Sequence, residues 1–313
     1  MKPDLLVTAE LPAPIVSTLK EKFVVHDAWH AKDIVPFVSE IAHRIKAVFT
    51  LNSVGADAEF MDQLPGLEII CCLGVGYDRI DLDAARERGI AVTNSPGSNS
   101  SCVADLAMTL LLDAVRRVSL MDRKMRELGW LADRLTNVAP GFNHKKIGIV
   151  GMGNIGQAIA QRAAGFDLDI HYHSRTPKPD LPYHYHNDVL SMAREADYLV
   201  LACPGGRETH HLVSRPVLEA LGPGGTLVNI ARGSVVDQAA MTEMLSSGQL
   251  GAAGLDVFDG EPIVPELLMQ LDNVVVTPHI GGVTLNAIGD AVDMVVANLD
   301  AYFEGRPLLT QVT

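Results

Sequence analysis

The sequence predicts an α/β protein of two domains with parallel sheets, linked by two long interdomain helices. Three observations predict this class. Short β-branched segments alternate with helical patterns along most of the chain, as in parallel sheets with crossover helices. A glycine-rich turn at 151–156 follows an apolar strand in mid-chain, where a second sheet begins. The length of 313 residues suits one large or two ordinary domains, at about 150 residues per domain.

Short apolar segments in the first third of the chain predict the strands of a first sheet. The expected strands are 4–9 (DLLVTA), 23–28 (FVVHDA), 47–51 (AVFTL), 67–73 (LEIICCL) and 90–94 (IAVTN). Helical patterns at 12–22 and 57–64 lie between some of these strands. This part of the chain is therefore expected to form one α/β domain.

The pattern changes at 95–125, SPGSNSSCVADLAMTLLLDAVRRVSLMDRKM. Pro96 and Gly97 interrupt the chain, and the serines and Asn99 offer oxygens that can cap a helix N-terminus. Apolar residues then recur at the spacing of one helix face, at Val103, Leu106, Ala107, Leu110 and Leu111. We expect a long helix here.

A second set of apolar segments predicts a second sheet. The expected strands are 147–150, 169–173, 198–203, 226–231, 252–258 and 273–279, and a second long helix is expected near 284–305. The second sheet is thus inserted into the first domain. We expect a first domain of residues 1–97 plus 286–313 and a second domain of residues 98–285. Ligands of open parallel sheets bind beyond the carboxyl ends of the strands, so we expect the chemistry in the cleft between the domains.

Composition limits the possible partners. The chain has 25 Lys+Arg against 38 Asp+Glu, a formal net charge of −13, which argues against nucleic acid or an anionic membrane as the main partner. Asp4 and Glu10 interrupt the region where a signal peptide needs an apolar run, and no stretch reaches the ~18 apolar residues that span a bilayer. Without a CxxC pair, the cysteines are expected to be free thiols of a cytoplasmic protein, with no metal site; they are Cys71, Cys72, Cys102 and Cys203.

The glycine-rich turn has the pattern of a dinucleotide phosphate site. Gly151 permits the tight turn, Gly153 lets the backbone approach a pyrophosphate, and Gly156 lets helix and strand pack closely. The helix that starts with Asn154 and Ile155 would offer its N-terminal N–H groups and positive dipole to the phosphates. A lone GxGxxG is weak evidence, but between a strand and a helix it predicts nucleotide binding.

The segment after the next strand predicts the choice of cofactor. An acidic residue is expected there for the ribose hydroxyls of NAD, but the chain has Ser174, Arg175 and Thr176. A hydroxyl and a guanidinium suit the dianionic 2′-phosphate of NADPH, and Lys178 could contribute. The alternative is an ordinary solvated loop. We expect NADPH, with NADH as the weaker cofactor.

Three further segments carry polar residues at expected strand ends. Arg232 follows one strand in a turn of small residues, Glu261 follows the next, and His279 lies between Pro278 and two glycines. Taken singly, each is more often a surface or structural residue than a catalytic one. Together they lie at the carboxyl ends of strands, where a Rossmann-type sheet presents its ligands.

The motifs together resemble the D-isomer-specific 2-hydroxyacid dehydrogenases. The matching stretches, which follow the family order over nearly the whole chain, are LGVGYDRIDLDAARERGIAVTNSPG, VADLAMTLLL, GIVGMGNIGQAIA, LVNIARGSVVD, AAGLDVFDGEP and VVVTPHIGG. Within the family, HSRTPKP and the chain length are most similar to the NADPH-dependent glyoxylate/hydroxypyruvate reductases and their hydroxyphenylpyruvate-reducing relatives. The resemblance implies Rossmann-like or flavodoxin-like domains, with residues 1–97 plus 286–313 as the substrate-binding (catalytic) domain and residues 98–285 as the dinucleotide-binding Rossmann domain.

The resemblance also implies residue roles. His279 would donate a proton to the 2-oxo oxygen as hydride arrives from the nicotinamide, since the ordinary histidine pKa lies near working pH. Glu261 would hold the imidazole and favour its protonated form. Arg232 would bind the substrate carboxylate and stabilise charge in the transition state. Val75 and Gly76 would hold the carboxylate through backbone amides, and Leu51 and Asn52 are weaker candidates for lining the substrate.

Further positions match the cofactor side of the family. Asp256 matches the residue that contacts the nicotinamide carboxamide, and Ser100 lies where relatives meet the nicotinamide-side phosphate. The remaining positions expected to contact cofactor are Ile155, Cys203, Pro204, Ile230, Ala231 and Gly281. Ser101 and Cys102 depart from the acids common in relatives, so contacts near the interdomain hinge are in doubt. Cys102 starts a helix, where its pKa could fall, but hydride transfer needs no covalent step.

The sequence leaves alternatives open for the substrate, the class of function and the oligomeric state. Glyoxylate and hydroxypyruvate are the preferred 2-oxo acids, with an aryl pyruvate as the close alternative. A nucleotide-sensing corepressor is the rival of another class, which the acidic composition disfavours, and the missing acid after residue 173 disfavours NAD-linked oxidation of phosphoglycerate. We expect a homodimer through 121–135, which includes Trp130; the alternative is a helix packed on its own domain.

Overall fold

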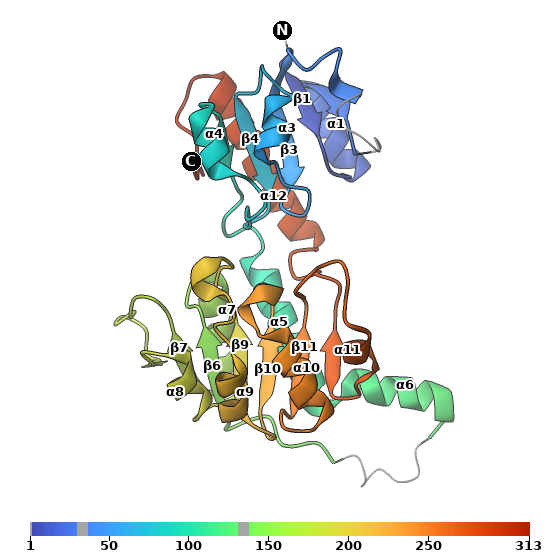
Figure 1. Cartoon of the computed structure of the whole chain (residues 1–313), viewed down its shortest axis with the longest axis vertical. Helices are drawn as coiled ribbons and strands as arrows, with labels where there is room; N and C mark the ends of the chain where they lie inside the picture. Colours follow the sequence, from blue (N-terminus) through green and yellow to red (C-terminus); the bar gives the residue numbers. More distant parts are fainter. Residues whose placement is uncertain (1, 30–36, 131–137) are drawn as a thin grey trace. The chain divides into compact units, whose positions relative to one another are not determined.

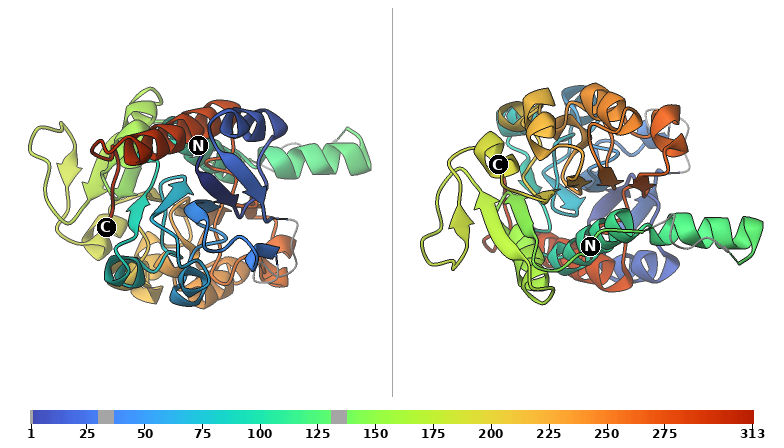
Figure 2. Two further views of the ribbon diagram at one scale, coloured as in Figure 1. Left: turned by 90° about the horizontal axis from the view of Figure 1, so that it is seen from above. Right: turned by 90° about the horizontal axis from the view of Figure 1, so that it is seen from below.

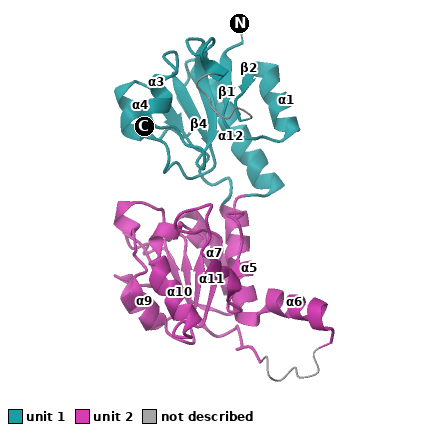
Figure 3. Cartoon of the chain, turned by 45° about the vertical axis from the view of Figure 1, so that its right-hand side comes forward, with its two compact units in different colours: residues 1–99, 283–313 teal, residues 100–282 magenta. Residues whose placement is uncertain are grey.

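Each of two parallel sheets organises its own unit of the chain (Figures 1 and 3). The computed structural model describes residues 2–29, 37–130 and 138–313. Unit 1 comprises Met1–Asn99 and Val283–Thr313, and unit 2 comprises Ser100–Gly282. The chain therefore passes from unit 1 to unit 2 between Asn99 and Ser100, and back to unit 1 between Gly282 and Val283.

Unit 1 contains a five-stranded sheet of order β2-β1-β3-β4-β5, in which every neighbouring pair is parallel. The strands are β1 (Asp4–Val7), β2 (Val24–Asp27), β3 (Ile45–Leu51), β4 (Ile69–Leu73) and β5 (Ala91–Thr93). All five strands expected from the first third of the sequence are confirmed. The apolar runs LLV of β1 and IICCL of β4 are continuous, because helices cover both faces of the sheet.

The helices of unit 1 form two layers. α1 (Ala13–Lys22) and α12 (Leu285–Phe303) pack on one face with Leu5 and Val7 of β1 (Figure 2). α3 (Ala58–Asp62) and α4 (Leu82–Glu87) pack on the other face with Leu6. Neighbouring residues of β1 point to opposite faces, as in any strand.

Unit 2 contains a seven-stranded parallel sheet of order β12-β11-β10-β9-β6-β7-β8. Its strands are β6 (Lys146–Val150), β7 (Asp169–His173), β8 (His184–Tyr185), β9 (Tyr198–Leu201), β10 (Thr226–Asn229), β11 (Ala252–Leu255) and β12 (Val274–Val276). The six predicted strands are confirmed. β8 was not predicted, because two residues are too short for a periodic pattern.

Helices also cover both faces of the sheet in unit 2 (Figure 2). One face carries α5 (Ser100–Arg116) and α7 (Asn154–Ala164). The other carries α8 (Val189–Ala193), α9 (Arg215–Leu221), α10 (Gln238–Ser246) and α11 (Glu266–Gln270). The strand order reverses at β6, whose neighbours are β9 and β7. Sheets of this kind bind ligands at such a switch point, and the glycine-rich turn follows β6.

A long helix begins at or just after each point where the chain crosses from one unit to the other. α5 starts at Ser100 and packs on α7, β10 and β11 within unit 2, whereas α12 packs on β4 within unit 1. The helix expected in 95–125 is divided at Arg117, whose φ is 56°. α6 (Val118–Leu128) then begins a new direction (Figure 1), with the Asp113 carboxylate accepting a hydrogen bond from Ser119 N at 2.8 Å.

Candidate active site

The residues expected to do chemistry in unit 2 follow three adjacent strands. Arg232 follows β10, Glu261 follows β11 and His279 follows β12, and β10, β11 and β12 are neighbours in one parallel sheet. The carboxyl ends of parallel strands lie on one edge of the sheet. The fold therefore brings these side chains to the edge that the sequence predicted.

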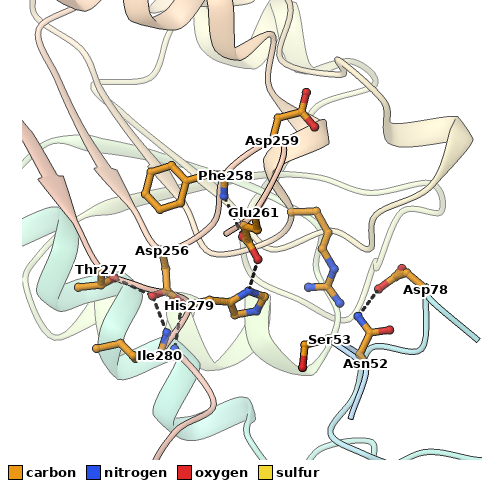
Figure 4. Close-up of polar contacts among 12 residues, drawn as sticks. Asn52, Ser53, Asp78, Asp256, Phe258, Asp259, Glu261, Thr277, His279 and Ile280 are labelled. Carbon is orange, nitrogen blue, oxygen red and sulfur yellow. Dashed lines mark hydrogen bonds and ion pairs between the residues drawn. The ribbon is translucent and has the colours of Figure 1, made fainter. Parts of the chain in front are cut away.

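His279 and Glu261 form a direct pair (Figure 4). The His279 Nδ1 atom lies 2.8 Å from Glu261 Oε2, and the other carboxylate oxygen accepts a hydrogen bond from Phe258 N at 2.9 Å. A carboxylate only accepts, so Nδ1 carries the proton and donates it to this bond. The His279 side chain is 49% exposed, and this tautomer leaves Nε2 as the ring nitrogen that can exchange a proton with a ligand.

Asp256 anchors the segment that carries His279 (Figure 4). Asp256 is 2% exposed, and its carboxylate accepts hydrogen bonds from Thr277 Oγ1 at 2.6 Å and Ile280 N at 2.8 Å. The carboxylate also accepts from Gly281 N at 2.9 Å. Its backbone carbonyl also accepts a bond from His279 N at 2.9 Å. Its predicted contact with a nicotinamide carboxamide stays a prediction, and the contacts in the structure assign it a role in holding residues 277–281.

Arg232 lies in a turn that glycines make possible. A Cβ on Gly205 would come within 2.6 Å of Arg232 Cγ, and a Cβ on Gly233 would come within 1.9 Å of the Phe258 backbone. The Asn229 amide fixes the same turn, donating to the Arg232 carbonyl at 2.9 Å and accepting from Ala231 N at 3.0 Å. The Arg232 side chain is partly buried and donates to the Ala231 carbonyl at 2.7 Å.

The glycine-rich turn has the geometry that the motif predicts. Gly151 has φ 97°, and a Cβ there would lie 2.7 Å from the Cys203 backbone. A Cβ on Gly156 would lie 2.0 Å from the Gly151 carbonyl oxygen, so only glycine lets α7 approach the turn. Gly153 has no atom within 4 Å of an added Cβ, which is the open approach that a pyrophosphate needs. The residues present fit a dinucleotide.

The segment after β7 presents Arg175 to solvent. Ser174 Oγ donates to the Thr176 carbonyl at 2.8 Å, and the Tyr172 hydroxyl fixes the end of the loop by accepting from Lys178 N at 2.9 Å. Arg175 is 87% exposed, and its Nη1 lies 3.5 Å from Glu208 Oε2. Glu208 lies in the short 3-10 helix Arg207–Thr209 after β9. This exposed ion pair was not anticipated.

The other positions expected on the cofactor side lie near the same sheet edge or at helix starts. Ser100 is the first residue of α5, and Asn154 is the first of α7, followed by the partly buried Ile155. The residues directly after β9 and β10 include Pro204, whose carbonyl accepts from Thr209 Oγ1 at 2.8 Å, and the buried Ile230. The contacts of these residues with a cofactor stay predictions.

In unit 1, the residues expected to line the substrate follow β3 and β4. Asn52, which follows Leu51, donates from its amide to Asp78 Oδ2 at 3.2 Å (Figure 4). Its side-chain oxygen accepts from Arg79 N at 3.1 Å. Arg79 Nη1 donates to the Ser53 carbonyl at 3.0 Å. Asn52 thus joins the loop after β3 to the loop after β4, which a sequence position alone did not reveal.

The loop with Val75 and Gly76 is fixed by residues that the sequence analysis did not single out. The Asn94 side-chain amide donates to the Val75 carbonyl at 2.8 Å, and Ser95 N donates to the Gly74 carbonyl at 2.8 Å. The Cys72 thiol lies 3.3 Å from the Gly76 carbonyl. The sequence feature that could have indicated this role is Asn94 itself, a polar residue at the end of a buried strand.

None of the four cysteines, all of them in the described part of the chain, forms a disulfide; Cys71 and Cys72 are buried, and Cys102 and Cys203 are partly exposed. Burial raises the pKa of Cys203 to about 11 and the pKa of Cys71 and Cys72 to about 12. Among residues 2–29, 37–130 and 138–313, no three His, Cys, Asp or Glu residues group as a metal site would require. None of the helices in that described part of the chain has the length and apolar character to cross a membrane.

The sequence and the fold match one family of oxidoreductases. Residues 108–281 match the family model described as D-isomer specific 2-hydroxyacid dehydrogenase, NAD binding domain. The chain belongs to the D-isomer specific 2-hydroxyacid dehydrogenase family.

Particular relatives cover almost the whole chain. A hydroxyphenylpyruvate reductase of Plectranthus scutellarioides is 43% identical over 94% of both chains, and a glyoxylate/hydroxypyruvate reductase A of Arabidopsis thaliana is 41% identical over 98% of both. The crystal structure of an NADPH-dependent glyoxylate/hydroxypyruvate reductase from Sinorhizobium meliloti, in complex with NADP and malonate, is 35% identical. It has a TM-score of 0.89 and is matched over 100% of this chain and 97% of that one.

Proposed function

We propose that the chain reduces a small 2-oxo acid to its D-2-hydroxy acid with NADPH. The observation that carries the proposal is the His279–Glu261 pair, 2.8 Å apart, on the same sheet edge as Arg232 and the glycine-rich turn. A proton donor, a carboxylate-binding cation and a nucleotide turn are the parts that reduction of a 2-oxo acid requires. Glyoxylate and hydroxypyruvate are the preferred substrates, as in the names of several relatives.

The bound nicotinamide supplies the hydride. His279 Nε2 donates a proton to the substrate oxygen as negative charge develops there. Glu261 accepts the Nδ1 hydrogen bond, orients the ring and stabilises the positive charge that the ring carries before it gives up the proton. In unit 2, Arg232 binds the substrate carboxylate and polarises the carbonyl. In unit 1, the N–H groups of Val75 and Gly76 bind a carboxylate oxygen.

The cofactor is held by the residues around β6 and β7. The N–H groups at the start of α7 bind the pyrophosphate, and Gly153 lets it approach the backbone. Ser174, Arg175 and Thr176 bind the adenosine 2′-phosphate, because these residues, and not a carboxylate, come directly after β7. Arg175 carries most of this selectivity, since a guanidinium forms paired hydrogen bonds with phosphate.

The direct test is the loss of NADPH absorbance when glyoxylate is added. We expect turnover by the unmodified protein and loss of turnover in His279→Ala with NADPH binding retained. Absence of turnover with every 2-oxo acid in a panel would refute an enzymatic function. An aryl pyruvate is the close alternative substrate, favoured by the hydroxyphenylpyruvate reductase of Plectranthus scutellarioides.

We also propose a homodimer of a cytoplasmic protein, with α6 at its interface. Val118, Met125, Leu128 and Trp130 are 60%, 46%, 70% and 74% exposed, so an apolar stripe runs along this helix and beyond it. Exposed apolar patches of this kind mark protein interfaces. The segment expected at the interface is 121–135, of which 131–135 lie outside the described residues. Sedimentation of Leu128→Glu as a monomer, beside a dimeric unmodified protein, would support this interface.

A further inference from the structure

In the loop that follows β4, the carbonyls of Gly74, Val75 and Gly76 are all bonded within unit 1. The Gly74 carbonyl accepts from Ser95 N at 2.8 Å, the Val75 carbonyl accepts from Asn94 Nδ2 at 2.8 Å, and the Gly76 carbonyl accepts from the Cys72 thiol at 3.3 Å. Burial raises the pKa of Cys72 to about 12, so its thiol stays protonated and remains a donor. Asn94 and Ser95 are 7% and 0% exposed.

These bonds fix the direction of the N–H groups in the same loop. A peptide unit is planar and trans, so the carbonyl of one residue and the N–H of the next point in opposite directions. The bond from Ser95 to the Gly74 carbonyl therefore orients the N–H of Val75. In the same way, the bond from Asn94 to the Val75 carbonyl orients the N–H of Gly76.

The N–H groups of this loop are available to a ligand. Across the part of unit 1 that the structure describes, neither Val75 N nor Gly76 N donates a hydrogen bond to the protein. Two adjacent N–H groups directed to one side, with their carbonyls held on the other, form a concavity that binds an anion. Because these hydrogen bonds already hold the loop, anion binding does not lose conformational entropy by ordering it.

Asn94 is itself held by the C-terminal segment. Thr310 Oγ1 donates to the Asn94 carbonyl at 2.6 Å, and the Asn298 amide of α12 donates to Thr310 Oγ1 at 2.9 Å. Asn298 is 0% exposed, and its side-chain Oδ1 accepts from Leu309 N at 2.9 Å. A continuous chain of hydrogen bonds thus runs from α12 through Thr310 and Asn94 to the Val75 carbonyl.

We infer that Asn94 is a positioning residue for the substrate carboxylate. It acts by holding the Val75 carbonyl so that the Gly76 N–H faces the ligand, and it does not touch the substrate. This inference rests on the proposed function, in which Val75 and Gly76 bind the carboxylate. The buried side-chain amide of Asn94 in unit 1 thus contributes to substrate affinity.

The test compares Asn94→Ala with the unmodified protein, using oxalate as a carboxylate that cannot be reduced. Removing the donor leaves a buried carbonyl unpaired and the peptide unit free to rotate. We expect about a tenfold increase in the oxalate Kd, measured with NADPH bound, and in the KM for glyoxylate. The affinity for NADPH alone should stay within about twofold, because its proposed site is in unit 2.

A second variant, Asn94→Asp, provides a pH readout that a general loss of stability would not produce. An ionised carboxylate cannot donate to the Val75 carbonyl, whereas a protonated one can. The oxalate Kd of Asn94→Asp, relative to that of the unmodified protein at the same pH, should therefore fall as the pH is lowered from about 8 to about 5.5. Asn94→Ala should show no such recovery.

Asn273→Ala is the matched control. The Asn273 amide also donates to loop carbonyls, those of Leu245 and Gly251, but in unit 2. We expect unchanged oxalate binding in this variant. Unchanged binding in Asn94→Ala as well would overturn the inference alone. Loss of both oxalate and NADPH binding in Asn94→Ala would overturn it too, by making Asn94 a residue of general stability. An unmodified protein that neither binds oxalate nor reduces glyoxylate would contradict the proposed function first.

Discussion

Replacement of Arg175 by alanine tests the proposed choice of cofactor. A charge-assisted hydrogen bond contributes about 1.5–3 kcal/mol, and the 87% exposure of Arg175 places its bond to phosphate near the lower end of that range. Binding of the phosphate also releases the exposed ion pair with Glu208, which stabilises the free protein by about 0–1 kcal/mol. The net contribution is about 1–2 kcal/mol, which corresponds to about a 5- to 30-fold increase in KM for NADPH.

The assay measures KM for NADPH and for NADH at saturating glyoxylate. The KM for NADH should stay within about twofold in Arg175→Ala, because NADH has no 2′-phosphate to lose a partner. Arg215→Ala is the control, since Arg215 is another arginine of unit 2 that pairs with a glutamate, Glu243, although its side chain is only 39% exposed. An equal increase for both cofactors, or an unchanged KM for NADPH, would refute the phosphate-binding role of Arg175.

Three further changes test the site and the fold. His279→Ala should lower kcat by about 10²- to 10⁴-fold with NADPH affinity retained; an unchanged kcat in a stopped-flow assay would remove His279 from the mechanism. Gly233→Ala should destabilise unit 2 by about 3 kcal/mol or more in denaturant unfolding, because the new Cβ would lie 1.9 Å from the Phe258 backbone. Gly224→Ala is the control and should be nearly neutral, because its Cβ would meet no atom within 4 Å. Similar unfolding midpoints for the two variants would contradict this packing. Partial burial, with a smaller contribution from His171, lowers the pKa of His186 from its ordinary value of 6.5. The contribution of His186 to folding stability is therefore complete above about pH 6.5 and is lost as the pH falls through the lowered pKa. His186→Asn should therefore have a flatter dependence of Tm on acid pH, and parallel curves would count against it.

Much of the fold could be predicted because its signals are local. The strand that ends at Val150 is a continuous apolar run, and the turn after it needs glycine at Gly151 and Gly156 for reasons that the motif itself encodes. Arg232, Glu261 and His279 could likewise be placed, because each follows a recognisable strand, and parallel strands end on one edge. Local pattern and topology were sufficient for these positions.

The parts that could not be predicted depend on contacts between segments distant in sequence. The sequence suggested Asn52 as a substrate-lining residue, but its amide bonds Asp78 and Arg79, which are 26 and 27 residues away. Asn94 was not singled out, because its bond to Val75 spans 19 residues. The ion pair between Arg175 and Glu208 belongs to the same class. A side chain's hydrogen-bond partner is set by the packed structure and not by its neighbours in the chain.

The most direct test of the central claim is a set of kcat/KM values for glyoxylate, hydroxypyruvate and hydroxyphenylpyruvate, each measured with NADPH and with NADH. The proposed function predicts the highest values for glyoxylate or hydroxypyruvate with NADPH, and lower values for each substrate with NADH. Equal or higher values with NADH would contradict the assignment of Ser174, Arg175 and Thr176 to the 2′-phosphate. Absence of turnover with all three acids would contradict the proposed reductase.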